Sequence, residues 1–245
     1  MLKHTVFVLT LFIIAGLIFI MMHIQHKHTI SNDAIKGKER WVFLVHGVLR
    51  SASSMSKIEN VLKEKGFKTH NFEYSSRKET IKAISKRLHK EIKKVYERDI
   101  ESISFVTHSF GTIVIRYYLA NHTLKAKGRF VMIAPPNKGS QWARILSRLS
   151  LYQWVLGVAG GKIQDVEKSI PAITAAPPIE FGVIAGGMGT RIGMNPLLPG
   201  DDDGTVTVEE TRLEGMKDFI QIIGQHSLLL TQKSVIDNVV HFLNT

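Results

Sequence analysis

One serine stands where a chain can present a nucleophile, in the stretch FVTHSFGTIV (105–114). Strand-like residues precede Ser109 and an apolar, helix-like run follows it. On such a turn a serine can project its hydroxyl over the end of a sheet, and its neighbours must be small because backbones pass close to it. Gly111 meets this need, whereas Thr107 replaces the usual first glycine. The alternative is an ordinary serine that caps the N-terminus of a helix.

Two downstream segments contain the acid and the base that a serine nucleophile requires. They are PGDDDGTVTVEET (199–211) and GQHSLLL (224–230), and they follow the chain order Ser, Asp, His of hydrolases built on parallel sheets. We predict Asp203 as the acid, because Gly204 lets the chain turn there. We predict His226 as the base, because it follows a strand-like segment and a glycine.

The acidic stretch leaves other interpretations open. Asp202 is the alternative acid, although we expect Asp201 and Asp202 to be solvated near the tip of the loop. The stretch could instead form a polar turn or a calcium-binding cluster, and a single histidine is more often structural. The residues after Asp203 are expected to continue into an extended segment.

An oxyanion hole needs two backbone N–H groups aimed at the developing negative charge. One is predicted to be the N–H of Phe110, the residue after the nucleophile. The other is predicted to be the N–H of Val48, in the loop HGVLRS (46–51). Gly47 allows the close approach of this loop, and His46 is expected to brace it and not to act as a second base.

The elements that must position these groups alternate along the chain. Buried strands are indicated by short apolar runs, and helices by apolar residues spaced three and four apart. This pattern predicts a mainly parallel sheet of about six strands with helices on both faces, and sites at the carboxyl ends of the strands. Strands are expected at 41–47, 68–74, 103–108, 129–136, 179–187 and 218–224, and helices at 54–65, 78–98, 111–121 and 234–243.

Composition excludes some kinds of protein. The 245 residues are 44% hydrophobic and 22% charged, which is typical of a globular protein. The net charge of +11 suggests nucleic acid, an anionic membrane or acidic substrates, but no nucleic-acid-binding motif is present. The absence of cysteine excludes disulfides, thiolate metal sites and a cysteine nucleophile.

The motifs together resemble the α/β-hydrolase superfamily, and within it the small bacterial lipases and esterases. Besides the serine turn, the oxyanion loop, the acidic loop and the histidine segment, they include APPNKGS (134–140), and they span about 41–243. The resemblance implies Ser109, Asp203 and His226 as a catalytic triad, with Val48 and Phe110 as oxyanion donors. It also implies no cofactor, no metal and a sheet without the first two strands of the full fold. We interpret 134–140 as site architecture.

The first residues differ from the rest of the chain. The uncharged run TVFVLTLFIIAGLIFIMM (5–22) is just long enough to span a bilayer. Residues 1–24 are therefore predicted to be a transmembrane anchor or a signal, and 25–39 a linker, before a hydrolase domain over 40–245. Enzymes of this build more often lie outside the cytoplasm, which favours an extracytoplasmic domain, although the lysines after the run favour the opposite side. Residues 139–178 are predicted to be a cap insertion.

The favoured function is hydrolysis of a carboxylic ester, and the apolar insertion with the predicted anchor favours a lipidic one. The alternatives are an acyltransferase, a thioesterase or an amide hydrolase, a lipid-remodelling deacylase with the same triad, and an inactive membrane-tethered binding module. The basic stretch 77–98 is a second predicted membrane contact, with a solvated amphipathic helix as its alternative.

Overall fold

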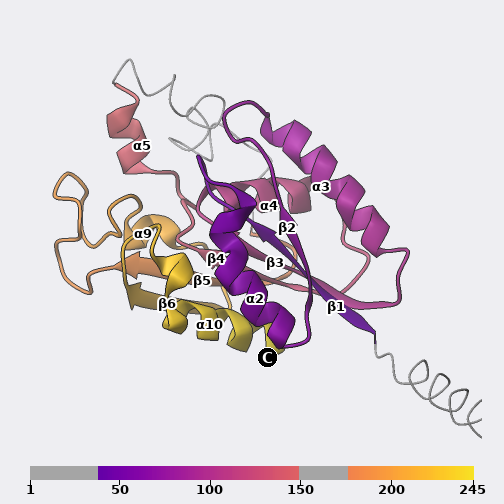
Figure 1. The fold of residues 1–245 in the computed structure, drawn as a ribbon. Helices are drawn as coiled ribbons and strands as arrows, with labels where there is room; N and C mark the ends of the chain where they lie inside the picture. Colours follow the sequence, from indigo (N-terminus) through magenta and orange to yellow (C-terminus); the bar gives the residue numbers. More distant parts are fainter. Residues whose placement is uncertain (1–37, 149–175) are drawn as a thin grey trace, which may run out of the picture. The chain divides into compact units, whose positions relative to one another are not determined.

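The computed structural model describes residues 38–148 and 176–245, and Glu39–Thr245 forms one compact unit. Its centre is a six-stranded sheet in the order β2-β1-β3-β4-β5-β6, in which every neighbouring pair is parallel (Figure 1). The strands are β1 (Glu39–Val45), β2 (Lys68–Phe72), β3 (Ile100–His108), β4 (Arg129–Ile133), β5 (Glu180–Gly187) and β6 (Asp218–Ile223). The predicted parallel sheet is confirmed.

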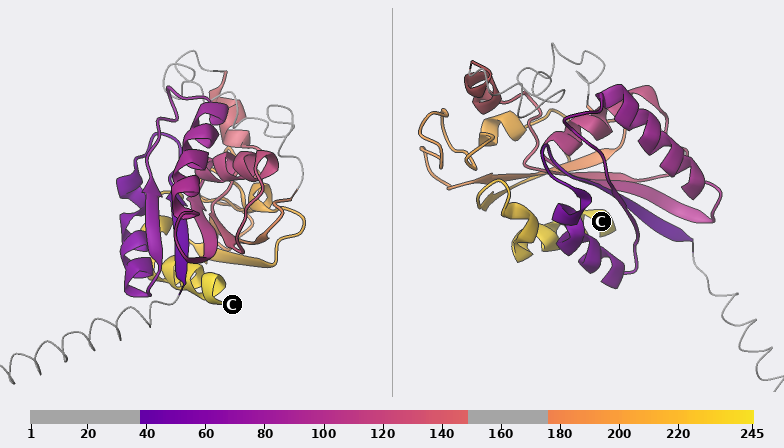
Figure 2. Two further views of the ribbon diagram at one scale, coloured as in Figure 1. Left: turned by 90° about the vertical axis from the view of Figure 1, so that its right-hand side faces the viewer. Right: turned by 45° about the horizontal axis from the view of Figure 1, so that its top comes forward.

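Helices cover both faces of this sheet, as predicted. The α3 and α4 helices pack on one face and α2 and α10 on the other, which Figure 2 shows in its right-hand view. The helices are α2 (Ser56–Glu64), α3 (Ile81–Val95), α4 (Phe110–Asn121), α5 (Gln141–Leu146), α9 (Val208–Thr211) and α10 (Lys233–Asn244).

The apolar runs of the sequence form strands because both faces of the sheet are covered. In β1, Phe43 and Val45 pack into the cluster beneath α3 and α4, while Val42 and Leu44 pack into the cluster beneath α2 and α10. Successive side chains of a strand point to opposite faces, so a run without polar residues is needed to fill both layers.

The strand order reverses at β1, and this decides where a site can form. After β1 the chain pairs β2 on one side and then returns to place β3 on the other. In open parallel sheets, ligands bind in the crevice outside the carboxyl ends of the strands at such a point. The loop after β1 and the turn after β3 meet here, and these segments contain the predicted oxyanion loop and Ser109.

One local prediction is wrong. The residues after Asp203 do not continue as an extended segment, because Thr207 begins the short helix α9. The Thr207 side chain accepts from the Glu210 N–H, and the Glu210 carboxylate accepts from the Thr207 N–H, which is a capping box. The sequence TVEE contains this signal. In addition, β4 ends at Ile133, ahead of the two prolines.

Several predictions concern residues outside the described ranges. These are the N-terminal anchor or signal (1–24), nearly all of the linker (25–39) and most of the cap insertion (139–178), of which α5 is described. Within residues 38–148 and 176–245, no helix is both long and apolar enough to cross a membrane.

Candidate active site

The turn at Ser109 has the strained backbone that an exposed nucleophile requires. Ser109 lies between the end of β3 and the start of α4, with φ 52° and ψ −123°. Positive φ is unusual for a residue other than glycine and must be held by its surroundings. Here the Ser109 N–H donates to the Ile133 carbonyl at 2.9 Å. The Ser109 side chain makes no capping hydrogen bond to α4, so the helix-cap interpretation fails.

Two glycines allow neighbouring backbones to approach this turn. A Cβ on Gly111 would lie 2.3 Å from the Val45 carbonyl oxygen, and a Cβ on Gly47 would lie 3.2 Å from the Ser109 Cβ. Both distances are too short for a side chain without movement. The small residues therefore hold the loop after β1 against the serine turn.

Thr107 fits the position where a glycine is usual because its side chain points into the strand–helix junction. It is fully buried, and its hydroxyl is hydrogen-bonded to the Thr112 hydroxyl of α4 at 2.7 Å. Thr107 thus ties the end of β3 to the first turn of α4.

The two predicted oxyanion donors flank this turn. Within the described residues, neither the Val48 N–H nor the Phe110 N–H makes a hydrogen bond, so both could donate to a ligand. The loop that presents Val48 is fixed by its neighbours: the Tyr74 hydroxyl donates to the His46 carbonyl at 2.7 Å, and the Leu49 N–H donates to the Ser76 hydroxyl at 3.0 Å.

His46 has the geometry of the predicted bracing residue. Its ring stacks on Tyr74 with centroids 4.2 Å apart, and its Nδ1 is hydrogen-bonded to the Gly47 carbonyl at 2.8 Å. Burial lowers the pKa of His46, against the smaller opposing effects of its hydrogen bond to the Gly47 carbonyl and of Glu73. A neutral, stacked ring held to its own loop stabilises that loop.

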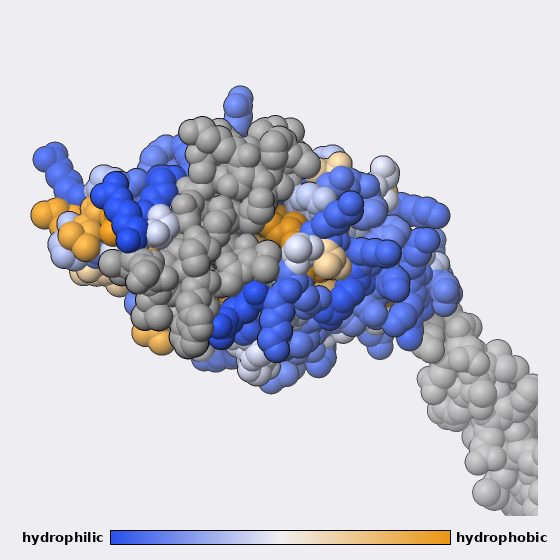
Figure 3. Space-filling view, turned by 90° about the horizontal axis from the view of Figure 1, so that it is seen from above, coloured by the Kyte–Doolittle hydropathy of each residue, from blue (hydrophilic) through white to orange (hydrophobic). Residues whose placement is uncertain are grey.

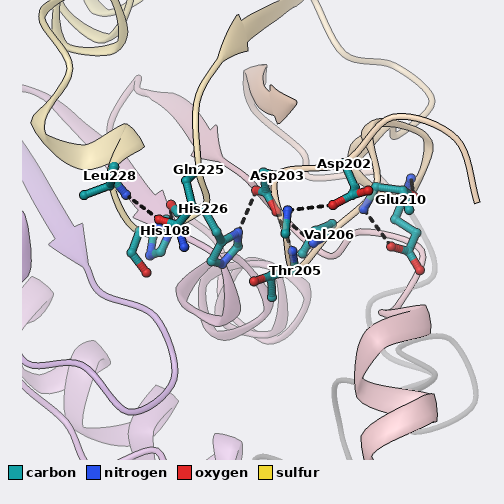
Figure 4. Close-up of polar contacts among 12 residues, drawn as sticks. His108, Asp202, Asp203, Thr205, Val206, Glu210, Gln225, His226 and Leu228 are labelled. Carbon is teal, nitrogen blue, oxygen red and sulfur yellow. Dashed lines mark hydrogen bonds and ion pairs between the residues drawn. The ribbon is translucent and has the colours of Figure 1, made fainter. Parts of the chain in front are cut away.

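The predicted acid and base are in direct contact. His226 Nδ1 lies 2.7 Å from Asp203 Oδ2 (Figure 4). The other carboxylate oxygen of Asp203 accepts from the N–H groups of Thr205 at 3.0 Å and Val206 at 2.8 Å. Asp203 is therefore a buried and fully hydrogen-bonded acceptor, which assigns the ring proton of His226 to Nδ1 and leaves Nε2 available as a base.

The alternative acid, Asp202, makes hydrogen bonds within the acidic loop and none to His226 among the described residues. Its carboxylate accepts from the Gly204 N–H at 2.7 Å and the Asn195 N–H at 3.0 Å, and so it holds the acidic loop together. The prediction that Asp202 is solvated is wrong, because it is fully buried, and this burial raises its pKa. Asp201 accepts from the Met188 N–H at 2.7 Å.

The metal-binding alternative requires several ligand side chains that converge on one point. Among residues 38–148 and 176–245, no group of three or more potential ligand side chains could hold a metal ion. The three aspartates face different partners, whereas a calcium site needs carboxylates that converge on one point.

His108 is a site residue that the sequence did not reveal. Its Nε2 is hydrogen-bonded to the His226 carbonyl at 3.0 Å, and the two rings have centroids 4.7 Å apart. Complete burial keeps the pKa of His108 well below its usual value, so its ring stays neutral and donates to that carbonyl. Because His108 directly precedes Ser109, this contact holds the predicted base close to the serine turn.

The predicted nucleophile and base are linked through His108, which precedes Ser109 in the chain and contacts His226. Within the described part of the chain, the Ser109 hydroxyl and the His226 ring make no hydrogen bond with each other. Such bonds often form only when a substrate is bound. The loops on both sides are also joined, because an Arg50 guanidinium nitrogen donates to the Ser227 hydroxyl.

The segment 134–140 supports the acidic loop, in agreement with its predicted role as site architecture. The Asn137 amide donates to the Thr211 carbonyl at 2.8 Å, and the Lys138 N–H donates to the Glu210 carbonyl at 3.1 Å. Arg116 of α4 donates to the Asn137 side chain at 3.1 Å. These bonds join the loop after β4 to α9 and thus to the strand ends around the site.

Comparison with solved structures decides the fold. The mature lipase BlEst2 of Bacillus licheniformis aligns with a TM-score of 0.69 at 19% identity, over 85% of this chain and 93% of that chain. The monoacylglycerol lipase of Paleococcus ferrophilus aligns with a TM-score of 0.57 at 15% identity, over 84% and 95%. The chain has the α/β-hydrolase fold. The phospholipase PlaB of Legionella pneumophila aligns with a TM-score of 0.51 at 17% identity, over 71% of this chain and 45% of PlaB.

A family model described as "Putative serine esterase (DUF676)" matches residues 36–149 of this chain. That range includes the oxyanion loop and the Ser109 turn, and it ends before the acidic loop. Comparison with curated proteins by sequence gave no match. The structural neighbours show the fold of this chain, and the match over residues 36–149 is to a family described as serine esterases.

Proposed function

We propose that the protein is a serine hydrolase of carboxylic esters that acts through Ser109, His226 and Asp203. The observation that carries the proposal is the buried Asp203–His226 pair, with 2.7 Å between Oδ2 and Nδ1, beside a strained serine turn at the point where the strand order reverses. A serine hydroxyl needs such a base, and the base needs such an acid to hold its tautomer.

In this mechanism the reaction has two steps. Ser109 Oγ attacks the ester carbonyl, His226 Nε2 takes the hydroxyl proton, and this proton then passes to the leaving alcohol. Water hydrolyses the acyl-enzyme by the same route, which regenerates the serine. Asp203 stays ionised, fixes the ring orientation and stabilises the imidazolium that forms in both steps.

Two backbone donors stabilise the oxyanion in both tetrahedral intermediates. The N–H groups of Val48 and Phe110 flank Ser109 and are not used by other described residues. Because the loop around Val48 is held by Tyr74 and Ser76, its N–H needs little reorganisation during the reaction. Losing one such donor typically raises the barrier by about 2.7 to 4 kcal/mol.

A lipidic substrate fits the surface around these groups. Large apolar side chains are exposed next to the catalytic loops, among them Leu49 at 48% and Leu228 at 59%. Met188, Ile192 and Leu197 are exposed on the loop after β5. Hydrophobic groups are visible at the left of Figure 3, the side toward which β5 and β6 point in Figure 1. Exposed apolar side chains near a site favour an apolar ligand.

We propose that residues 1–24 anchor the chain in a membrane, with the hydrolase domain outside the cytoplasm. The support is the uncharged run 5–22, which has the length of a bilayer-spanning helix. Protease treatment of intact cells, followed by detection of a C-terminal tag, tests the side. Loss of the tag is expected, and protection of the tag in intact but not in lysed cells would place the domain inside.

The enzyme proposal is tested with p-nitrophenyl esters of increasing acyl length and with a fluorophosphonate probe. The wild-type protein is expected to prefer longer acyl chains and to be labelled at Ser109. Absence of both labelling and hydrolysis would mean an inactive module of the same fold, and equal hydrolysis by wild type and Ser109→Ala would place the nucleophile elsewhere. Preference for a thioester, or acyl transfer to an added alcohol, would keep the triad and change the reaction.

A further inference from the structure

A groove between α3 and α4 forms a second polar site, separate from the strand ends. Its volume is about 310 Å³. Lys82, Lys86 and His89 of α3 form one wall, and Tyr117 with His122, at the end of α4, forms the other. Ser109 lies at the opposite end of α4, so the groove is not part of the candidate active site.

The groove has unbalanced positive charge. No carboxylate lines it, and within the described residues neither Lys82 nor Lys86 has a salt-bridge partner. The acidic residues of the same region are paired elsewhere, since Glu79 contacts Arg87 and Glu91 contacts Lys94. An anion in the groove would therefore meet cations without displacing an existing partner.

Two stacked histidines lie along the groove. The rings of His89 and His122 have centroids 4.2 Å apart and planes within 11° of each other. His89 Nδ1 lies 3.3 Å from the hydroxyl of Tyr118, which leaves its Nε2 for a ligand. Nitrogen lone pairs lie in the plane of each ring, so parallel rings cannot aim both at one metal ion. Protonated rings instead present two N–H groups side by side, which suits an acceptor with several oxygens.

The groove also contains a buried hydroxyl without a partner. Ser85 lines it, is 2% exposed, and its Oγ makes no hydrogen bond within the described residues. Buried hydroxyls are nearly always hydrogen-bonded. A ligand oxygen would satisfy this donor between the two lysines, which precede and follow Ser85 on α3.

We propose that this groove binds a phosphate group with two negative charges, either free or as the monoester headgroup of a lipid. The phosphate oxygens accept from Lys82 and Lys86, from the imidazole N–H groups and from the Ser85 hydroxyl. A tetrahedral group with several acceptor oxygens matches this set of donors, whereas a neutral ligand would leave the lysine charges unbalanced.

Binding of an anion whose own charge is constant is expected to strengthen as the pH falls. Desolvation and the neighbouring His89 lower the pKa of His122 in the empty groove. An anion favours the protonated ring, so it raises this pKa and is bound together with a proton. The other ionisable groups that line the groove or contact these rings are Lys82, Lys86, Tyr117 and Tyr118.

The test is calorimetric titration of the full chain, kept in detergent micelles, with inorganic phosphate. The variant Lys82→Gln with Lys86→Gln is expected to bind phosphate at least about tenfold more weakly, and Ser85→Ala about threefold more weakly. The matched control is Lys65→Gln with Lys68→Gln, which removes the same charge from exposed positions outside the groove. It should bind like the wild type.

Two further measurements distinguish a free phosphate from a lipid headgroup and test the expected pH dependence. Dihexanoylphosphatidic acid, but not dihexanoylphosphatidylcholine, should compete with phosphate if the groove accepts a lipid headgroup, and failure of both identifies a free phosphate. Sulfate, whose charge is constant, should bind about tenfold more tightly at about pH 6 than at about pH 8. No binding by the wild type, equal loss in the control, or tight Zn²⁺ binding lost with His122→Gln would overturn the proposal.

Discussion

The carboxyl edge of the sheet and the α3–α4 groove use polar residues in opposite ways. At the edge, Asp203, Asp202 and His108 are buried and held by hydrogen bonds to backbone groups, which lie within the acidic loop for the two aspartates and at His226 for His108. In the groove, the lysines are exposed and the Ser85 hydroxyl has no partner in the described structure. Catalysis requires groups that are oriented in advance. Binding of an ion requires charge that the protein has not already neutralised.

The largest difference between ester hydrolysis at the sheet edge and phosphate binding in the groove is expected for Ser109→Ala. This change should lower kcat for p-nitrophenyl esters about 10⁵-fold or to the background rate, because the nucleophile is lost. Phosphate affinity of the groove should not change. Ser53→Ala, at an exposed serine, is the control and should keep full activity. Retained hydrolysis in Ser109→Ala would move the nucleophile elsewhere.

Variants of the two buried aspartates test which of them is the catalytic acid. Asp203→Asn should lower kcat about 10⁴-fold with little loss of stability, because an amide no longer holds the correct tautomer of His226. Asp202→Asn should change kcat by less than about tenfold and lower the melting temperature instead, since it weakens the bonds to Gly204 and Asn195. The reverse pattern would assign the catalytic acid to Asp202.

The burial of His108 is expected to make the free energy of unfolding depend on pH. Its pKa in the folded protein is well below its ordinary value because the ring is buried. Below about pH 6.5 the unfolded chain takes up a proton that the folded chain does not, so the free energy of unfolding falls by about 1.4 kcal/mol per pH unit. His108→Gln should remove this part of the slope in urea titrations at several pH values. His46, His70 and His122, whose pKa values are also lowered, leave a residual slope in both proteins.

The smallest effect is expected at the threonine pair below the serine turn. Thr107→Val leaves the buried Thr112 hydroxyl without its partner and should lower the free energy of unfolding by about 1 to 3 kcal/mol, with kcat within about threefold. The double variant Thr107→Val with Thr112→Val should recover part of that loss. A double-mutant cycle by urea denaturation checks this, and strict additivity would show that the pair makes no net contribution.

Much of the fold could be predicted because its signals are local. The apolar run 41–45 of β1 is uninterrupted because both faces of the sheet are covered, and the spacing from Ile81 to Val95 matches the buried face of α3. The capping box at Thr207 is also a local signal, but the residues before it were predicted to lead into an extended segment. Helices of one turn are easily missed because a short segment shows no periodicity.

The amino-acid sequence by itself determined the strand and helix order and the types of residue at the strand ends, because periodicity and turn chemistry act over a few residues. Only the tertiary structure decided which aspartate meets His226, that Asp202 is buried, that His108 supports the base, and that Ser85 lies in a basic groove. These outcomes depend on pairs far apart in the chain, such as His108 and His226, which are 118 residues apart. Their contact follows from strand order and packing, and no local pattern encodes it.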